Sequence, residues 1–137
     1  MEKVIADTGF VVAVANRLDQ RHAEVVPVYL QYPQILLPQF ALVEIAYLIG
    51  RDIGIGSVVQ FLQYLSVSRF EVITATDQDI DRTASILEKY LDSRVDFVDA
   101  SIMAIAERLN IQTVLTIDQR DFRLFRPKHC EYFILKP

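Results

Sequence analysis

Short apolar segments alternate with helical patterns from one end of the 137-residue chain to the other. Five segments have the Val-, Ile- and Leu-rich composition and the short length of buried strands: residues 3–6, 35–37, 70–73, 112–117 and 132–135. Parallel strands need a crossover between them, usually a helix, so this alternation predicts a parallel sheet with helices on both faces. We expect a single domain over residues 1–137, an α/β fold built as a three-layer α/β/α sandwich with a central parallel sheet of four to five strands.

Helical periodicity predicts six helical segments between these strands, over residues 10–15, 18–30, 39–50, 57–65, 76–91 and 96–109. Pro27 should kink the second segment or end its regular hydrogen bonding. In the third, Phe40, Val43, Tyr47 and Leu48 share an apolar face, and Glu44 lies on or beside that face. An acid in such a place is costly to bury unless it is paired or binds a metal.

The fifth helical segment has an acidic start and a regular apolar spacing. Ile80, Ala84, Leu87 and Leu91 recur at helical steps, and this predicts that they form the buried stripe of a long helix.

Residues 95–122 combine a helix, a turn, a strand and an acidic loop. Apolar residues recur there every three or four positions from Val98 to Leu109, as on one buried helix face. Asp96 suits the N-cap and Asp99 the first turn, where backbone N–H groups are unpaired and the helix dipole favours anions. Asn110 suits a left-handed helix end. Asp118 and Asp121 follow the strand at 112–117, at the kind of sheet edge where α/β proteins bind ligands.

Four acids should meet at that edge: Asp7 after the first strand, Glu44 in a helix, Asp99 at a helix start and Asp118 after the fourth strand. Clustered carboxylates repel, so they bind a cation or keep a proton. Oxygen ligands with no paired His or Cys nearby favour Mg²⁺ or Mn²⁺ over zinc. Such a metal orients an attacking water on a phosphate substrate. Taken singly, Asp7, Asp99 and Asp118 also fit turn or cap roles, so the prediction depends on all four coinciding.

The composition of the chain indicates which partners and which cell compartment to expect. The net charge is −4 and the pI is about 5.1, which argues against general affinity for nucleic acid. Cys130 is the only cysteine, so no intrachain disulfide forms, as is typical of a reducing cytoplasm. Residues 25–43 carry no charge, but three prolines interrupt them, and no secretory signal is visible. We expect a cytoplasmic protein that does not enter the membrane.

Four motifs, VIADTGF, PQFALVEIAYLI, VDASIMAIAERL and TVLTIDQRDF, occur in an order and at separations that resemble PIN-domain nucleases over the whole chain. In size the chain is most similar to the toxin ribonucleases of VapBC-type toxin–antitoxin pairs. The resemblance implies that Asp7, Glu44, Asp99 and Asp118 are catalytic and bind Mg²⁺ or Mn²⁺, with Thr8 supporting the site and Asp96 and Asp121 as further acids. It also implies an RNA substrate cleaved by a metal-activated water, a homodimer, and inhibition by a small antitoxin whose C-terminal segment covers the active site.

Three features leave other interpretations open. Gly9 stands where the family commonly has Ser or Asn, which removes one polar side chain near the metal. Asp7-Thr8-Gly9 is also the signature of aspartic proteases, although those enzymes are all-β. A catalytically silent PIN-like scaffold, or a receiver-like module acting through a protein partner, remains the alternative function; a receiver would need a lysine late in the sheet, where this chain has acids.

One basic cluster follows Asp118. Arg120 and Arg123, with Arg126 and Lys128, are interleaved with Phe122 and Phe125. Arg120 and Arg123 are candidates for holding RNA phosphates, and a phenylalanine could stack on a base. The alternative is a solvated loop over buried aromatic rings.

Overall fold

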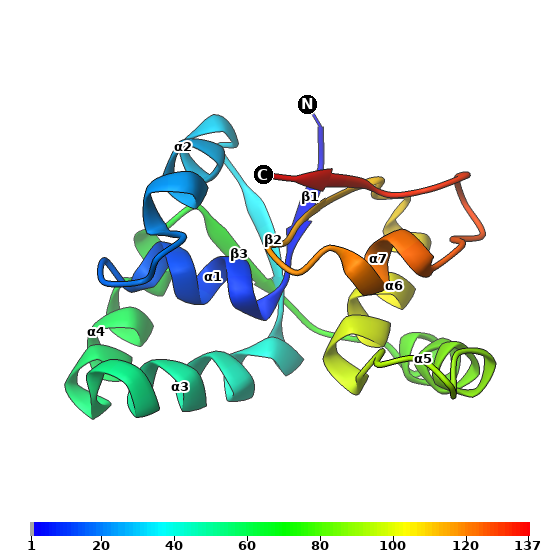
Figure 1. Cartoon of the computed structure of the whole chain (residues 1–137), viewed down its shortest axis with the longest axis horizontal. Coiled ribbons are helices and arrows are strands. Elements are labelled where there is room, and N and C mark those ends of the chain that lie inside the picture. The colour runs from blue at the N-terminus through cyan, green and yellow to red at the C-terminus, as the bar shows by residue number, and fades with distance from the viewer. Residues whose placement is uncertain (1) are drawn as a thin grey trace.

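The computed structural model describes residues 2–137 and contains a five-stranded, all-parallel sheet in the order β3-β2-β1-β4-β5 (Figure 1). The predicted fold class is confirmed. The strands are β1 (Val4–Ala6), β2 (Ile35–Pro38), β3 (Phe70–Ile73), β4 (Thr113–Leu115) and β5 (Ile134–Lys136). The first strand in sequence is therefore the central one, with β2 on one side of it and β4 on the other.

Helices cover both faces of the sheet (Figure 1). One face carries α1 (Thr8–Ala15), α2 (His22–Gln31), α3 (Gln39–Ile53), α4 (Ile55–Tyr64) and the short 3₁₀ helix η1 (Leu65–Val67). The other face carries α5 (Asp77–Lys89), α6 (Phe97–Leu109) and α7 (Arg120–Leu124). Within residues 2–137, no helix is both long and apolar enough to cross a membrane.

The strands alternate their side chains between two hydrophobic cores. Val4 and Ala6 of β1 point into the core beneath α1, α3 and α4, whereas Ile5 between them joins the core beneath α5 and α6. All three are fully buried. Strands buried on both faces explain why these segments are continuous apolar runs and show no alternation with polar residues.

The predicted apolar face of α3 is wrong. Ala41, Ile45 and Ile49 face the core, while Val43 and Tyr47 are 79% and 65% exposed. The helix carries two apolar stripes, and periodicity alone does not say which one is buried. The outer stripe packs with the adjoining α6, where the rings of Phe40 and Phe97 lie 5.1 Å apart.

The apolar stripe predicted for α5 is also wrong. Asp79, Thr83 and Ile86 are its buried residues, and Ile80 and Leu91 are largely exposed. The buried stripe contains an acid and a threonine because both are satisfied there: Arg108 pairs with Asp79, and the Thr83 hydroxyl donates to the Asp79 carbonyl. A polar stripe of this kind cannot be recognised from apolar spacing.

The ends of most elements differ from the predictions by a few residues. The predicted end of α3 at Gly50 is wrong, because the helix continues to Ile53 and Gly54 is its C-cap.

Two further differences are larger. Helix α2 begins at His22, because residues 18–21 form a turn, and it runs through Pro27 to Gln31. Pro27 is exposed, so the carbonyl that loses its backbone donor faces solvent. After β4, a short helix, α7, replaces the predicted loop. In α6 the predicted ends are confirmed: the Asp96 side chain caps the helix, and Asn110 has a left-handed backbone with φ 57°.

Candidate active site

The two central strands bring the first and the last of the predicted acids together. Ala6 of β1 is in register with Leu115 of β4, and the backbone N–H of Asp7 donates to the Leu115 carbonyl at 3.1 Å. Both strands end here, so the residues after them, Asp7 and the segment leading to Asp118, leave the sheet at the same edge. Helix α3 starts at this edge too, directly after β2.

A pocket of about 430 Å³ opens at this edge of the sheet. Six of the predicted site residues line it: Asp7, Thr8, Glu44, Asp96, Asp99 and Asp118. They come from the ends of β1 and β4, from the second turn of α3 and from the start of α6. No Lys, Arg or His side chain forms an ion pair with any of these carboxylates in the described part of the chain.

Asp7 is the most rigidly held of the acids. It is the N-cap of α1: one carboxylate oxygen accepts from the Phe10 backbone N–H at 3.0 Å, and the other accepts from the Thr116 hydroxyl. Burial raises the pKa of Asp7 to about 6; the two hydrogen bonds lower it, and the charges of Asp118 and Glu44 raise it further. A buried carboxylate between like charges is the environment that a cation would stabilise.

Asp99 lies in the first turn of α6, where Asp96 caps the helix by accepting from the Asp99 backbone N–H at 2.9 Å. The pKa of Asp99 is raised to about 8, most of all by burial and in addition by the nearby Asp96, Asp7 and Asp121. Asp99 therefore holds a proton at neutral pH unless a positive charge enters the pocket. Asp96 thus has a structural role as a cap and a position on the pocket wall.

Glu44 and Thr8 complete the wall. Glu44 is half-buried in α3, next to the core-facing Ile45 in sequence, and its side of the helix lines the pocket. The buried Thr8 hydroxyl oxygen has no hydrogen-bond partner, which leaves it free for a ligand in the pocket. A Cβ built on Gly9 would lie 3.9 Å from the Asp7 carboxylate, an ordinary contact, so the site tolerates the larger residues that the resemblance implies.

Asp118 and Asp121 differ from each other. Asp118 lies exposed at the mouth of the pocket, and its backbone carbonyl is 3.0 Å from the Thr116 hydroxyl. Asp121 is buried in the first turn of α7 and does not line the pocket, although its charge raises the pKa of Asp99. One of its carboxylate oxygens has no partner. Asp121 therefore lies near the clustered acids of the pocket but is not part of the pocket wall.

The pocket fits a hard divalent cation by its chemistry. Most of its polar lining residues are carboxylates, the Thr8 hydroxyl is buried without a partner, and the pKa values of two of the acids are raised by burial and like charge. Within residues 2–137, no three His, Cys, Asp or Glu side chains stand in a ready-made coordination geometry. Metal binding therefore requires the carboxylates to turn inward from the pocket wall.

Three residues at the site did not emerge from the sequence. Thr116 orients Asp7, and Arg21 and Arg51 line the same pocket as the acids. Arg51 follows Glu44 by seven residues on the same helix, so helical spacing could have identified it. Thr116 and Arg21 are placed by tertiary structure and left no local signal.

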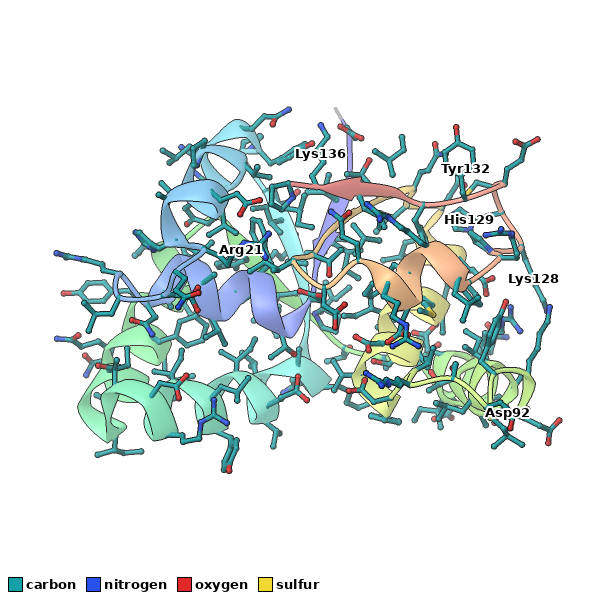
Figure 2. All side chains as sticks on the ribbon, in the orientation of Figure 1. Arg21, Asp92, Lys128, His129, Tyr132 and Lys136 are labelled. Atoms are coloured by element: carbon teal, nitrogen blue, oxygen red, sulfur yellow. The ribbon has the colours of Figure 1, made fainter. Side chains whose placement is uncertain are left out.

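The basic cluster after Asp118 has no base-stacking surface. Phe122 and Phe125 are each 1% exposed and belong to the core beneath α6, so a stacking role for them is excluded. Arg120, Arg123 and Arg126 are exposed along α7 and the loop after it. The cluster leads away from the pocket: Lys128 lies at the far end of the molecule from Arg21 (Figure 2).

Comparison with known proteins identifies the family. Residues 4–126 match the PIN domain. A curated relative, "Ribonuclease VapC26" of Mycobacterium tuberculosis, is 26% identical over 125 residues, which are 90% of this chain and 93% of that protein. The protease interpretation of Asp7-Thr8-Gly9 is excluded by the parallel α/β sheet.

Solved structures share the fold. The VapC20 toxin of M. tuberculosis, described as cleaving the sarcin–ricin loop, superposes with a TM-score of 0.78 and 22% identity, covering 85% of this chain and 91% of that one. A toxin–antitoxin complex from Klebsiella pneumoniae gives a TM-score of 0.70 at 17% identity, covering 96% of this chain and all of the other. At these identities the likeness supports the architecture alone.

Proposed function

The chain belongs to the PIN domain family, and on that premise we propose that it is a Mg²⁺- or Mn²⁺-dependent endoribonuclease, the toxin of a toxin–antitoxin pair. The observation that carries the proposal is the pocket in which Asp7, Glu44, Asp99 and Asp118 share one wall without an ion-pair partner among the described residues. The match to a ribonuclease over nearly the whole chain supports the same activity.

These four carboxylates are the proposed metal ligands and catalytic residues, and Thr8 supports them. Such a cation, once bound, stabilises charge on a phosphodiester and lowers the pKa of an attacking water. The chain supplies positioning: Thr116 and the Phe10 N–H fix the Asp7 carboxylate, and the α6 cap fixes Asp99. Asp99 gives up its proton as the positive charge enters, because the raised pKa derives from burial and from like charges. Asp96 and Asp121 act on this proton through their own charge.

The activity test uses purified protein and end-labelled RNA with Mg²⁺, Mn²⁺ or EDTA. We expect cleavage with either metal, none in EDTA, and a loss of at least about a hundredfold in Asp7→Asn, since a ligand to the reacting centre is removed. The matched control is Asp81→Asn, an exposed acid on α5 outside the pocket, which should cleave like wild type. Cleavage that persists in EDTA, or in Asp7→Asn, contradicts the proposal.

RNA and a small antitoxin are the proposed partners. We propose that Arg120 and Arg123, exposed on α7 just after Asp118, bind RNA phosphates where the RNA strand leaves the site. The antitoxin proposal draws on the structural neighbour solved as a toxin–antitoxin complex. Expression of the chain alone should arrest growth, and co-expression of the neighbouring small reading frame should relieve it. Growth arrest that also occurs with Asp7→Asn would show that toxicity does not come from cleavage.

A homodimer is the proposed assembly. The outer stripe of α3 and the start of α6 expose Val43, Tyr47 and Phe97 side by side around a groove that Glu44 also lines. An exposed apolar patch of this kind is typical of an interface. Val43→Asp should convert a dimer into a monomer in light scattering. Val67→Asp, an equally exposed valine on η1, should leave the dimer intact. A monomeric wild-type protein would contradict this assembly.

A further inference from the structure

The pocket that holds the carboxylates also carries two arginines. Of the pocket-lining residues, Arg21 and Arg51 are the two with cationic side chains. Both reach solvent, with side chains 43% and 58% exposed. Asp19 and Asp52 line the pocket beside them. The lining therefore combines acids from the ends of β1 and β4, α3 and α6 with arginines from the last turns of α3 and from the turn before α2.

Arg21 stands on a braced turn. The Asn16 side chain accepts from the Leu18 N–H at 2.9 Å, and the Asp19 side chain accepts from the N–H of Arg21 itself at 2.8 Å. His22, the next residue, bonds the Ala13 carbonyl of α1 through a ring nitrogen at 2.7 Å. Arg21 is thus held beside α1, where Figure 2 labels it. Its own backbone, and with it the origin of its side chain, is fixed relative to Asp7.

Arg51 shares a helix face with one of the proposed metal ligands. Glu44, Leu48 and Arg51 are spaced four and three residues apart in α3, and all three line the pocket. At 1.5 Å per residue, Arg51 lies about 10 Å along the helix from Glu44. An arginine at this distance along the helix can contact a phosphate next to the one at the carboxylates.

Each arginine is at present paired within its own segment. Arg21 pairs with Glu24, three residues on, and Arg51 Nε donates to Asp52 at 2.8 Å. Exposed pairs of this kind are worth about 0–1 kcal/mol, so an RNA phosphate can displace the local carboxylate. A phosphate also offers two oxygens to the planar guanidinium. The local pairs meanwhile keep both arginines from folding over onto the acids of the pocket.

An RNA strand needs such contacts here. The chain has a net charge of −4, and the carboxylates repel phosphate on the side where cleavage is proposed. The cluster at Arg120 and Arg123 lies outside the pocket and leads away from it. We infer that Arg21 and Arg51, which line the same pocket as the carboxylates, bind the RNA backbone there, each holding a phosphate that flanks the scissile one. This inference rests on the proposed ribonuclease function.

The test measures binding and cleavage separately. Binding of a fluorescent, mixed-sequence single-stranded RNA is followed in Mg²⁺ in the Asp7→Asn background, over 50–200 mM salt. Adding Arg21→Gln and Arg51→Gln should raise Kd at least about tenfold and reduce the salt slope by about 0.7 for each phosphate that is no longer neutralised. In the Asp7 chain, the same two changes should raise KM with kcat within about twofold, because the arginines hold neighbouring phosphates.

Two controls separate charge from fold. Lys89→Gln removes an exposed cation that does not line the pocket and should change neither Kd nor the salt slope. Arg51→Lys keeps the charge but loses the paired geometry, so it should keep the slope while weakening binding. Circular dichroism and Tm confirm that each variant is folded.

The outcomes distinguish this inference from the proposed function. Cleavage by wild type together with unchanged Kd and slope in the double variant overturns the arginine assignment alone. A wild-type protein that neither binds nor cleaves RNA overturns both. Weaker binding of an acidic peptide, with RNA binding unchanged, would reassign the two arginines to a protein partner and also overturn the inference.

Discussion

Two groups of buried acids in this molecule have opposite environments. At the junction of α5 and α6, Asp79 and Glu107 are each bound by an arginine: Arg108 Nε lies 2.9 Å from Asp79, and Arg82 Nε lies 2.7 Å from Glu107. These partners hold the pKa of both carboxyls below the ordinary value against the opposing effect of burial. In the pocket, Asp7 and Asp99 have acids for neighbours, and their pKa values are raised to about 6 and about 8.

The difference shows what each group contributes. Acids paired with arginine stabilise the contact between two helices and are chemically silent. Acids held together without a counter-charge weaken the folded state, and the surrounding structure must offset that cost. Each group contains one buried and one half-buried acid, so the partner of a carboxylate marks the candidate active site where exposure alone does not.

Substituting one acid of the pocket should separate activity from stability most strongly. Asp99→Asn removes a proposed metal ligand, so RNA cleavage should fall at least about a hundredfold. Above pH 6 the same change should raise the free energy of unfolding of the metal-free protein, because folding no longer has to bind a proton at this carboxyl or bury its charge. Cleavage assays and chemical denaturation measure the two effects. If the variant is both inactive and destabilised, the pocket acids stabilise the fold as the acids of the α5–α6 junction do, and the proposed difference between the two groups is wrong.

The two groups should give the metal-free protein opposite pH dependences. Asp7 and Asp99 bind protons more tightly when folded, so the free energy of unfolding should fall by several kcal/mol as pH rises from about 4 to 8. Asp79 and Glu107, with lowered pKa values, stabilise the fold above their ordinary pKa and lose that effect as pH drops below about 4. Denaturation in EDTA across pH 3–8.5 tests both parts of the stability profile, the limb above about pH 4 and the acid limb below it.

Added Mg²⁺ should flatten the limb above pH 5 and leave the acid limb unchanged, since a cation in the pocket favours the ionised carboxylates. Asp99→Asn should flatten the same limb without metal. A wild-type profile in EDTA that shows no fall between pH 5 and 8 would contradict the electrostatic account of the pocket.

The matching substitution at the α5–α6 junction should lower stability and leave cleavage unchanged. Asp79→Asn removes the charge facing Arg108 and weakens the capping box with Thr76, so stability should fall by about 2 kcal/mol. Cleavage per folded molecule at 25 °C should stay at the wild-type level. Thermal denaturation and RNA cleavage on the same preparation measure this pair of results, and a selective loss of cleavage would extend the active site to this junction.

The smallest expected effect concerns the hydroxyl that orients Asp7. Thr116→Val keeps the size of a fully buried side chain and removes its hydrogen bond to Asp7. Without that bond the pKa of Asp7 should rise above about 6 in the metal-free protein, measurable by carboxyl carbon NMR. Cleavage should fall by less than about tenfold and stability by about 1 kcal/mol. An unchanged Asp7 pKa would show that burial alone sets it.

Much of this arrangement is visible in the sequence. The strand–helix alternation predicted the parallel sheet, and Asp96 and Asn110 marked the two ends of α6 because caps depend on local chemistry. Parallel strand ends meet at one edge, so Asp7, Asp99 and Asp118 could be expected in one crevice, and the structure brings them to one pocket. Their catalytic role remains a prediction.

What the sequence did not show depends on contacts between distant residues. In α3 two apolar stripes compete, and only packing against β1 and β2 selects Ile45 over Val43. In α5 an acid occupies the buried stripe because Arg108 comes to meet it from α6. Thr116 reaches Asp7 across the sheet, and Arg21 reaches the pocket through a turn. None of these partners is close in sequence.

The central position of β1 links activity to the order in which the chain is made. Asp7 lies at the start, yet Thr116, which holds it, is 109 positions further on, and β4 is the strand that joins the two. A chain growing on the ribosome carries Asp7 and Glu44 long before it has β4, the strand that closes the pocket, and Asp99 is made only shortly before that strand. An enzyme proposed to cut RNA thus stays inert throughout most of its own translation, and its toxicity begins only when synthesis of the domain is nearly complete.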